Sequence, residues 1–233
     1  DYAGTFNGLG KKHDLLAGVD IYQEDAKRAN NFAGSSSGLT TTVGTPNDGD
    51  TFADTRGTVP FNTFDARNIG LYVQDTVSLT STVKLIGGLR YDNFNATYVT
   101  NTGVANDVTA NLWSPRVGAM FQPDENTSYY VSFGTSFNTS GDTYQFTPGA
   151  PNTKDANTPP EKSRNLELGG KFELFEKRAS LGAALFYSEK YNERNTDPDT
   201  ASQQQLLSGK RHATGVEINL AGRITPKWDI FYN

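Results

Sequence analysis

Charged residues recur at alternate positions in several strand-like segments of this 233-residue sequence. The segment GLRYD, residues 88–92, places Arg90 and Asp92 two positions apart. Alternate side chains of a β-strand lie on one face, so such charges can form ion pairs along or across strands. The charged residues whose parity in their predicted strands places them on the inward, polar face are Arg90, Asp92, Arg116, Glu167, Lys171, Glu173, Glu217 and Arg223. The pattern favours a structural role for these charges, in which they form ion pairs on the water-facing side of a sheet, over direct contact with a ligand.

Other kinds of chemistry find little support in the residues. His13 and His212 are the only histidines and there is no cysteine, so we expect no protein-bound metal and no cofactor. No nucleophile elbow of the type G-x-S-x-G occurs, and we expect the protein not to be an enzyme. The formal net charge of -5 argues against nucleic acid as a partner.

The elements that must position these charges are β-strands. In NIGLYVQDTVSLTSTVKLIGGLRYDNF, residues 68–94, apolar Leu71 and Val73 alternate with Tyr72 and Gln74, which is the period of a strand with one apolar face. No apolar run approaches the roughly 18 residues of a transmembrane helix. We therefore predict an all-β chain. The predicted strands are 1–9, 13–25, 67–79, 83–100, 109–122, 127–139, 163–174, 179–192, 206–223 and 228–233.

The connections between these strands alternate in length. Tight turns are expected at residues 10–12, 80–82, 123–126, 175–178 and 224–227, and longer connections at 26–66, 101–108, 140–162 and 193–205. Short turns at one end and long loops at the other are typical of an outer-membrane barrel. Aromatic residues also gather beside the short turns, as at an interfacial girdle: Phe121, Tyr129, Phe175 and Trp228. A soluble antiparallel sheet with one solvated face gives the same alternation, so the facing pattern alone leaves both architectures open.

Five short motifs, in this order, carry a resemblance to a known family. They are YVQD (72–75), GLRYD (88–92), SPRVG (114–118), PEKS with LELG and a lysine (160–171), and ATGVEINLAG (213–222). Together they resemble the barrel of TonB-dependent siderophore receptors. Residues 1–67 carry no matching motif, and their similarity is one of strand and loop pattern.

The resemblance implies a partial antiparallel transmembrane β-barrel. Residues 1–233 would supply about ten strands of a barrel of about 22 strands, whose plug domain we expect to lie outside this sequence. It further implies a receptor in the bacterial outer membrane, surrounded by lipid, that imports a ferric siderophore with energy passed on by the TonB complex. TonB would act through regions outside this sequence, and iron would be carried as a chelate. The alternatives are a passive outer-membrane porin and a soluble β-sandwich binding protein.

The long loops are where such a ligand would first be met. Aromatic rings stack on catechol or hydroxamate groups, and cationic side chains attract an anionic ferric complex. The candidate ligand-binding residues are Arg56, Phe61, Phe64, Tyr144, Phe146 and Arg194.

Overall fold

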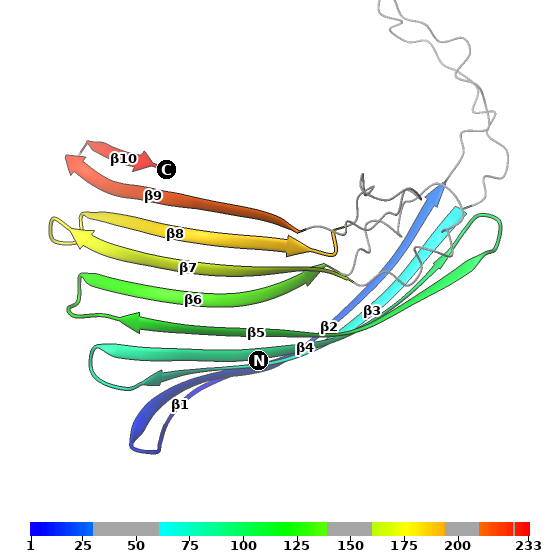
Figure 1. Ribbon diagram of the computed structural model, residues 1–233, viewed down its shortest axis with the longest axis horizontal. Coiled ribbons are helices and arrows are strands. Elements are labelled where there is room, and N and C mark those ends of the chain that lie inside the picture. The colour runs from blue at the N-terminus through cyan, green and yellow to red at the C-terminus, as the bar shows by residue number, and fades with distance from the viewer. Residues whose placement is uncertain (30–60, 139–159, 194–209, 226) are drawn as a thin grey trace, which may run out of the picture.

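The described residues of the chain form a single ten-stranded antiparallel sheet (Figure 1). The computed structural model describes residues 1–29, 61–138, 160–193, 210–225 and 227–233. Its strands are β1 (Tyr2–Gly8), β2 (Lys11–Ala29), β3 (Phe61–Ser78), β4 (Val83–Val99), β5 (Ala105–Phe121), β6 (Thr127–Asn138), β7 (Glu161–Leu174), β8 (Ala179–Tyr191), β9 (Arg211–Thr225) and β10 (Trp228–Tyr232). Each strand pairs with its neighbours in chain order, which confirms the ten predicted strands. No helix in the described part of the chain is long and apolar enough to cross a membrane.

Exposed apolar side chains predominate on one face of this sheet over most of its strands. The register makes Leu71 a direct partner of Tyr91, and Tyr91 a partner of Trp113, so apolar positions on neighbouring strands stand in rows. Exposed side chains on this apolar face include Val19, Ile21, Leu71, Val73, Leu85, Leu89, Val117, Val131, Leu166, Leu168, Leu185, Val216 and Ile218. The opposite, polar face carries Tyr72, Gln74 and Arg90. A soluble sheet buries its apolar face, whereas this one exposes it.

Five short turns lie together at one end of the sheet, on the left in Figure 1. The first turn, at Leu9 and Gly10, has φ angles of 50° and 72°, the pair of positive values that a tight two-residue hairpin requires. Backbone hydrogen bonds close others, as from Leu79 N–H to Val83 O at 2.9 Å. The predicted grouping of short turns is therefore correct. A soluble sandwich has no reason for such grouping.

Several strands run beyond their predicted ends. Pairing of β2 with β3 continues from Lys12 opposite Ser78 to Ala29 opposite Phe61, so residues 26–29 and 61–66, predicted as loop, belong to strands. The predicted connection 101–108 is also wrong, because β5 begins at Ala105 and residues 100–104 form a tight turn. These misplaced boundaries have one physical cause, which is a change in the phase of the apolar residues.

The phase changes at the aromatic pair Tyr91 and Trp113, whose ring centroids lie 4.7 Å apart on the apolar face. Beyond this pair the same face turns polar: Asn93 donates to Asn111 Oδ1 at 2.8 Å, and Thr97 donates to Asp107 at 2.6 Å. Tyrosine and tryptophan prefer a membrane–water boundary. The ends of β2–β5 beyond the pair, residues 20–29, 61–70, 92–99 and 105–112, form what we call the arm.

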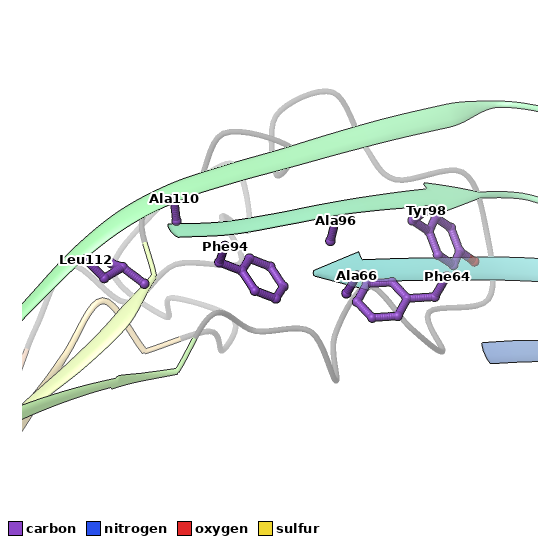
Figure 2. Packing of buried hydrophobic residues seen from close by; sticks show 7 residues of the cluster. All are labelled: Phe64, Ala66, Phe94, Ala96, Tyr98, Ala110 and Leu112. Carbon is purple, nitrogen blue, oxygen red and sulfur yellow. The ribbon is translucent and has the colours of Figure 1, made fainter. Parts of the chain in front are cut away.

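The buried core of the described residues lies on the polar-face side of the arm. Seven side chains from β3, β4 and β5 compose it (Figure 2): Phe64, Ala66, Phe94, Ala96, Tyr98, Ala110 and Leu112. The arm is therefore apolar inside and polar outside, whereas the part of the sheet below Tyr91 and Trp113 is polar inside and apolar outside. Such an inversion is expected where strands leave lipid and enter water.

Strand length supports the same conclusion. Strands β2 and β3 contain 19 and 18 residues, whereas β6 and β8 contain 12 and 13. A tilted strand crosses the bilayer core with about 9 to 11 residues. At about 3.3 Å per residue, the surplus of the longest strands reaches roughly 25 Å into the water. In Figure 1 this arm extends beyond the ends of β6–β9 and diverges from them.

Candidate functional site

A hydrogen-bonded network lies on the polar face across β2, β3 and β4. Arg90 donates to both oxygens of Asp92, from Nε to Oδ2 at 2.8 Å and from Nη2 to Oδ1 at 2.7 Å. Its third nitrogen, Nη1, donates to Asp20 Oδ2 at 2.6 Å. Asn68 adds a donor to Asp92 Oδ1 at 2.8 Å. Asp92 is only 1% exposed, so its oxygens are satisfied by these donors and not by water.

A second polar group lies on β6 and β7. The hydroxyl of Tyr130 donates to Glu167, and the ammonium of Lys171 lies 5.9 Å from the centre of the Tyr130 ring. Tyr130 is the direct cross-strand partner of Gly169. The ring lies over that glycine, since a Cβ built there would come within 2.5 Å of the ring. Glycine is needed here for the close approach of the ring.

The register shows where the predicted wall charges lie. Cross-strand partners share a face, and the partners of Arg90, Arg116 and Glu217 are Ser114, Gly88 and Ala184. All eight predicted charges fall on the polar face: Arg90, Asp92, Arg116, Glu167, Lys171, Glu173, Glu217 and Arg223. Only Arg90 and Asp92 pair with each other. Arg223 instead donates to Asp229 Oδ1 on β10 at 3.0 Å.

Several partners in these networks were missed by sequence reasoning. Asp20, Asn68 and Tyr130 all form hydrogen bonds with predicted charges. Their parity places them on the polar face, but only the register reveals which charge each of them meets. Asp20, for example, lies on β2 and reaches Arg90 on β4 across β3.

The predicted ligand-binding residues divide into two groups. Phe61 and Phe64 lie on β3 and not in a loop, which corrects their predicted position. Phe64 is 3% exposed within the core of the arm, whereas Phe61 is 52% exposed at the start of the strand. The other candidates, Arg56, Tyr144, Phe146 and Arg194, lie outside the described residues. A ligand-binding role for all six stays a prediction.

Cations at the outer ends of β7–β9 are paired with carboxylates. Glu189 accepts a hydrogen bond from Arg164 Nη2 at 2.9 Å, and its other oxygen lies 3.1 Å from Lys210 Nζ. Arg211 Nε lies 3.1 Å from Glu193 Oε2. Among the residues that the structure describes, no group of three or more His, Cys, Asp or Glu side chains could hold a metal ion.

The exposed apolar face of the sheet is stable in lipid and not in water. Because β-strands span a membrane only as closed barrels, this sheet is part of a transmembrane β-barrel. Over residues 1–233 the chain matches the family described as "TonB dependent receptor-like, beta-barrel". It belongs to that family, whose barrels lie in the bacterial outer membrane. The soluble β-sandwich is thereby excluded.

Curated relatives are similar over most of this chain. It is 28% identical over 196 residues to the probable TonB-dependent receptor BfrD of Bordetella pertussis, covering 79% of this chain and 26% of that protein. It is 30% identical over 186 residues to the catecholate siderophore receptor Fiu of Escherichia coli K12, covering 69% of this chain and 24% of Fiu. The chain thus spans about a quarter of the length of these relatives.

Solved structures share the fold. The closed form of the ferric-catecholate import receptor Fiu from Escherichia coli superposes with a TM-score of 0.76 at 22% identity, covering 99% of this chain and 37% of that structure. The siderophore receptor PiuA of Acinetobacter baumannii gives a TM-score of 0.72 at 21% identity, covering 98% and 36%.

Proposed function

We propose that this chain is the wall of an outer-membrane receptor that imports a ferric siderophore, with energy supplied through TonB. The observation that carries the proposal is the inversion of polarity at Tyr91 and Trp113, since it combines a membrane-spanning wall with an arm that extends into water. Long, structured extensions above the membrane suit a receptor that captures a scarce ligand outside the cell. The names of the relatives Fiu and PiuA, both siderophore receptors, support the ligand class.

Within this proposal the two faces have different tasks. The apolar face contacts lipid, and the polar face lines the interior, where a paired network such as Arg90–Asp92–Asp20 holds the wall rigid. Capture of the chelate is assigned to Arg56, Tyr144, Phe146 and Arg194, which lie in segments that the sequence predicts to be loops. Coupling to TonB is assigned to parts of the receptor outside this chain.

A passive porin is the second candidate, because a polar interior wall also lines an open channel. Energy dependence distinguishes the two. Cells starved of iron and expressing the full-length receptor should accumulate radioactive iron from a ferric siderophore, and deletion of TonB should abolish this uptake. Uptake that persists without TonB and is shared by unrelated small solutes would replace the receptor by a porin.

A further inference from the structure

Arg116 differs from the paired arginines of the polar face in the described residues, Arg90 and Arg223. Arg90 makes three hydrogen bonds to carboxylates, Arg223 bonds to Asp229, and Lys171 lies over a tyrosine ring. Arg116 has no ion pair and no side-chain hydrogen bond within the part of the chain that the structure describes. Among the described residues its guanidinium has no anionic partner, and a guanidinium is a strong binding group for anions.

Glycine flanks Arg116 on both sides. Its direct cross-strand partners are Gly88 on β4 and Gly134 on β6. A Cβ at Gly88 would come within 3.0 Å of Arg116 Nε and 3.1 Å of its Cγ, so the arginine side chain occupies the space that a larger residue would take. The guanidinium is therefore free of neighbouring side chains in its own row.

Arg116 lines a hollow of about 340 Å³. Its lining residues are Asp20, Tyr72, Val73, Leu89, Arg90, Ser114, Arg116 and Thr135. Asp20 is engaged by Arg90 and the Tyr72 hydroxyl by Asp1, so the open polar groups on this face are the guanidinium of Arg116 and the hydroxyl of Ser114. The volume lies within the range of roughly 300 to 1,000 Å³ of ligand pockets, and the available charge is positive.

We propose that Arg116 is a transit site for an anionic ferric chelate, contacting its negatively charged oxygens after the chelate has left the outer loops. The site lies on the short-turn side of Trp113, below the membrane boundary, and therefore acts after capture. The planar guanidinium of arginine can donate to two anionic oxygens at once. The ammonium group of a lysine acts as a point charge and lacks this two-pronged geometry. This inference rests on the proposed import function. It narrows the substrate of that function to negatively charged ferric chelates.

Arginine-specific dicarbonyl labelling of the purified full-length receptor tests the site, with each arginine quantified by peptide mass spectrometry. Arg178, exposed at the turn of residues 175–178, is the internal reference. Labelling of Arg116 should be rapid in the free receptor, slowed by an anionic tris-catecholate ferric chelate and unchanged by an uncharged trihydroxamate ferric chelate. Slow labelling without any chelate would show that another part of the receptor occupies the site, and would overturn the proposal. Equal rates with and without the anionic chelate would do the same.

Transport provides an independent readout. Arg116→Gln should lower uptake of the anionic chelate about tenfold, the factor expected for one hydrogen bond to a charged group, with surface binding unchanged. Lys84→Gln, on the same face of β4 near the short turn, is the matched control and should transport normally. Equal loss for the uncharged chelate would contradict the transit site. Absence of uptake of both chelates by the wild-type receptor would refute the import function itself, whereas the labelling still decides whether Arg116 binds the anion.

Discussion

Arg90 binds both carboxylate oxygens of Asp92, two positions further along the same strand, through hydrogen bonds of 2.8 and 2.7 Å. Bidentate pairs of this kind combine charge with directional geometry. Asp92 is buried and its partner is one-third exposed, so the aspartate depends on the arginine more than the reverse. Loss of the negative charge should therefore disturb the wall at the base of the arm.

Asp92→Asn should lower the free energy of unfolding by about 1–3 kcal/mol, because the amide cannot accept both guanidinium donors and leaves buried groups unsatisfied. Urea unfolding of the full-length receptor in lipid vesicles measures the change. Asp107→Asn is the control, since Asp107 lies on the outer face of the arm and accepts from Thr97. A control variant as unstable as Asp92→Asn would argue against a special role for the bidentate pair.

Val73 and Gln74 are adjacent in β3 and lie on opposite faces, Val73 toward lipid. Val73→Arg should impair membrane assembly, because arginine near the middle of the bilayer costs about 2 to 4 kcal/mol. Gln74→Arg should assemble nearly as well as the wild type. Heat-modifiable mobility after folding into vesicles gives the yield of each variant, and equal yields would mean that the faces are assigned wrongly.

Alternation predicted the membrane-spanning part of the fold because lipid on one side and water on the other impose a single phase on each strand. Val73 and Leu89 follow that phase, and all ten strands were found. The strand ends were missed where the phase reverses. Phe64 and Tyr72 lie an even number of positions apart on β3 and therefore lie on the same, polar face. The alternation of Leu71 and Val73 consequently does not predict that the strand extends to Phe64.

The sequence predicted which face of the sheet carries the charged residues of the candidate site, but not which residues they contact. Arg90 and Asp92 lie two positions apart on one strand, a spacing that permits their pairing. The contact of Arg90 with Asp20 depends on the register of three strands, which no local pattern contains. The isolation of Arg116 likewise emerges only when Gly88 and Gly134 are placed opposite it.

Single cysteines should report the orientation of the sheet, since the native sequence has none. Val104→Cys, in the turn of residues 100–104 at the tip of the arm, should react with a membrane-impermeant maleimide on intact cells. Glu125→Cys, in the short turn of residues 122–126 at the opposite end, should stay unlabelled until the outer membrane is permeabilised. Reversed labelling would invert the topology.

The core of the arm should stabilise the arm without being needed for the barrel. Phe94→Ala removes a ring that is 7% exposed, and truncation of a buried phenylalanine costs about 3 to 5 kcal/mol. We expect faster hydrogen exchange in residues 92–99 and 105–112, with normal exchange in β6–β9. Asn95→Ala, on the outer face of the same strand, is the control. A loss of assembly in Phe94→Ala would show that arm and barrel fold as one unit.

Two glycines provide a matched test of ring packing on the wall. At Gly169 an added methyl group would come within 2.5 Å of the Tyr130 ring, whereas at Gly87, on the apolar face, it would meet nothing within 4 Å. Gly169→Ala should therefore displace the ring, break its hydrogen bond to Glu167 and destabilise the receptor by about 1–3 kcal/mol.

Gly87→Ala should be neutral or slightly stabilising, because alanine restricts the unfolded chain where the native backbone accepts it. Urea midpoints of the two variants in lipid vesicles measure the difference. A double-mutant cycle with Tyr130→Ala then isolates the cause, since the two changes act on one contact and their effects should fall short of additivity. Additive effects would mean that Gly169 is required by the backbone and not by the tyrosine ring.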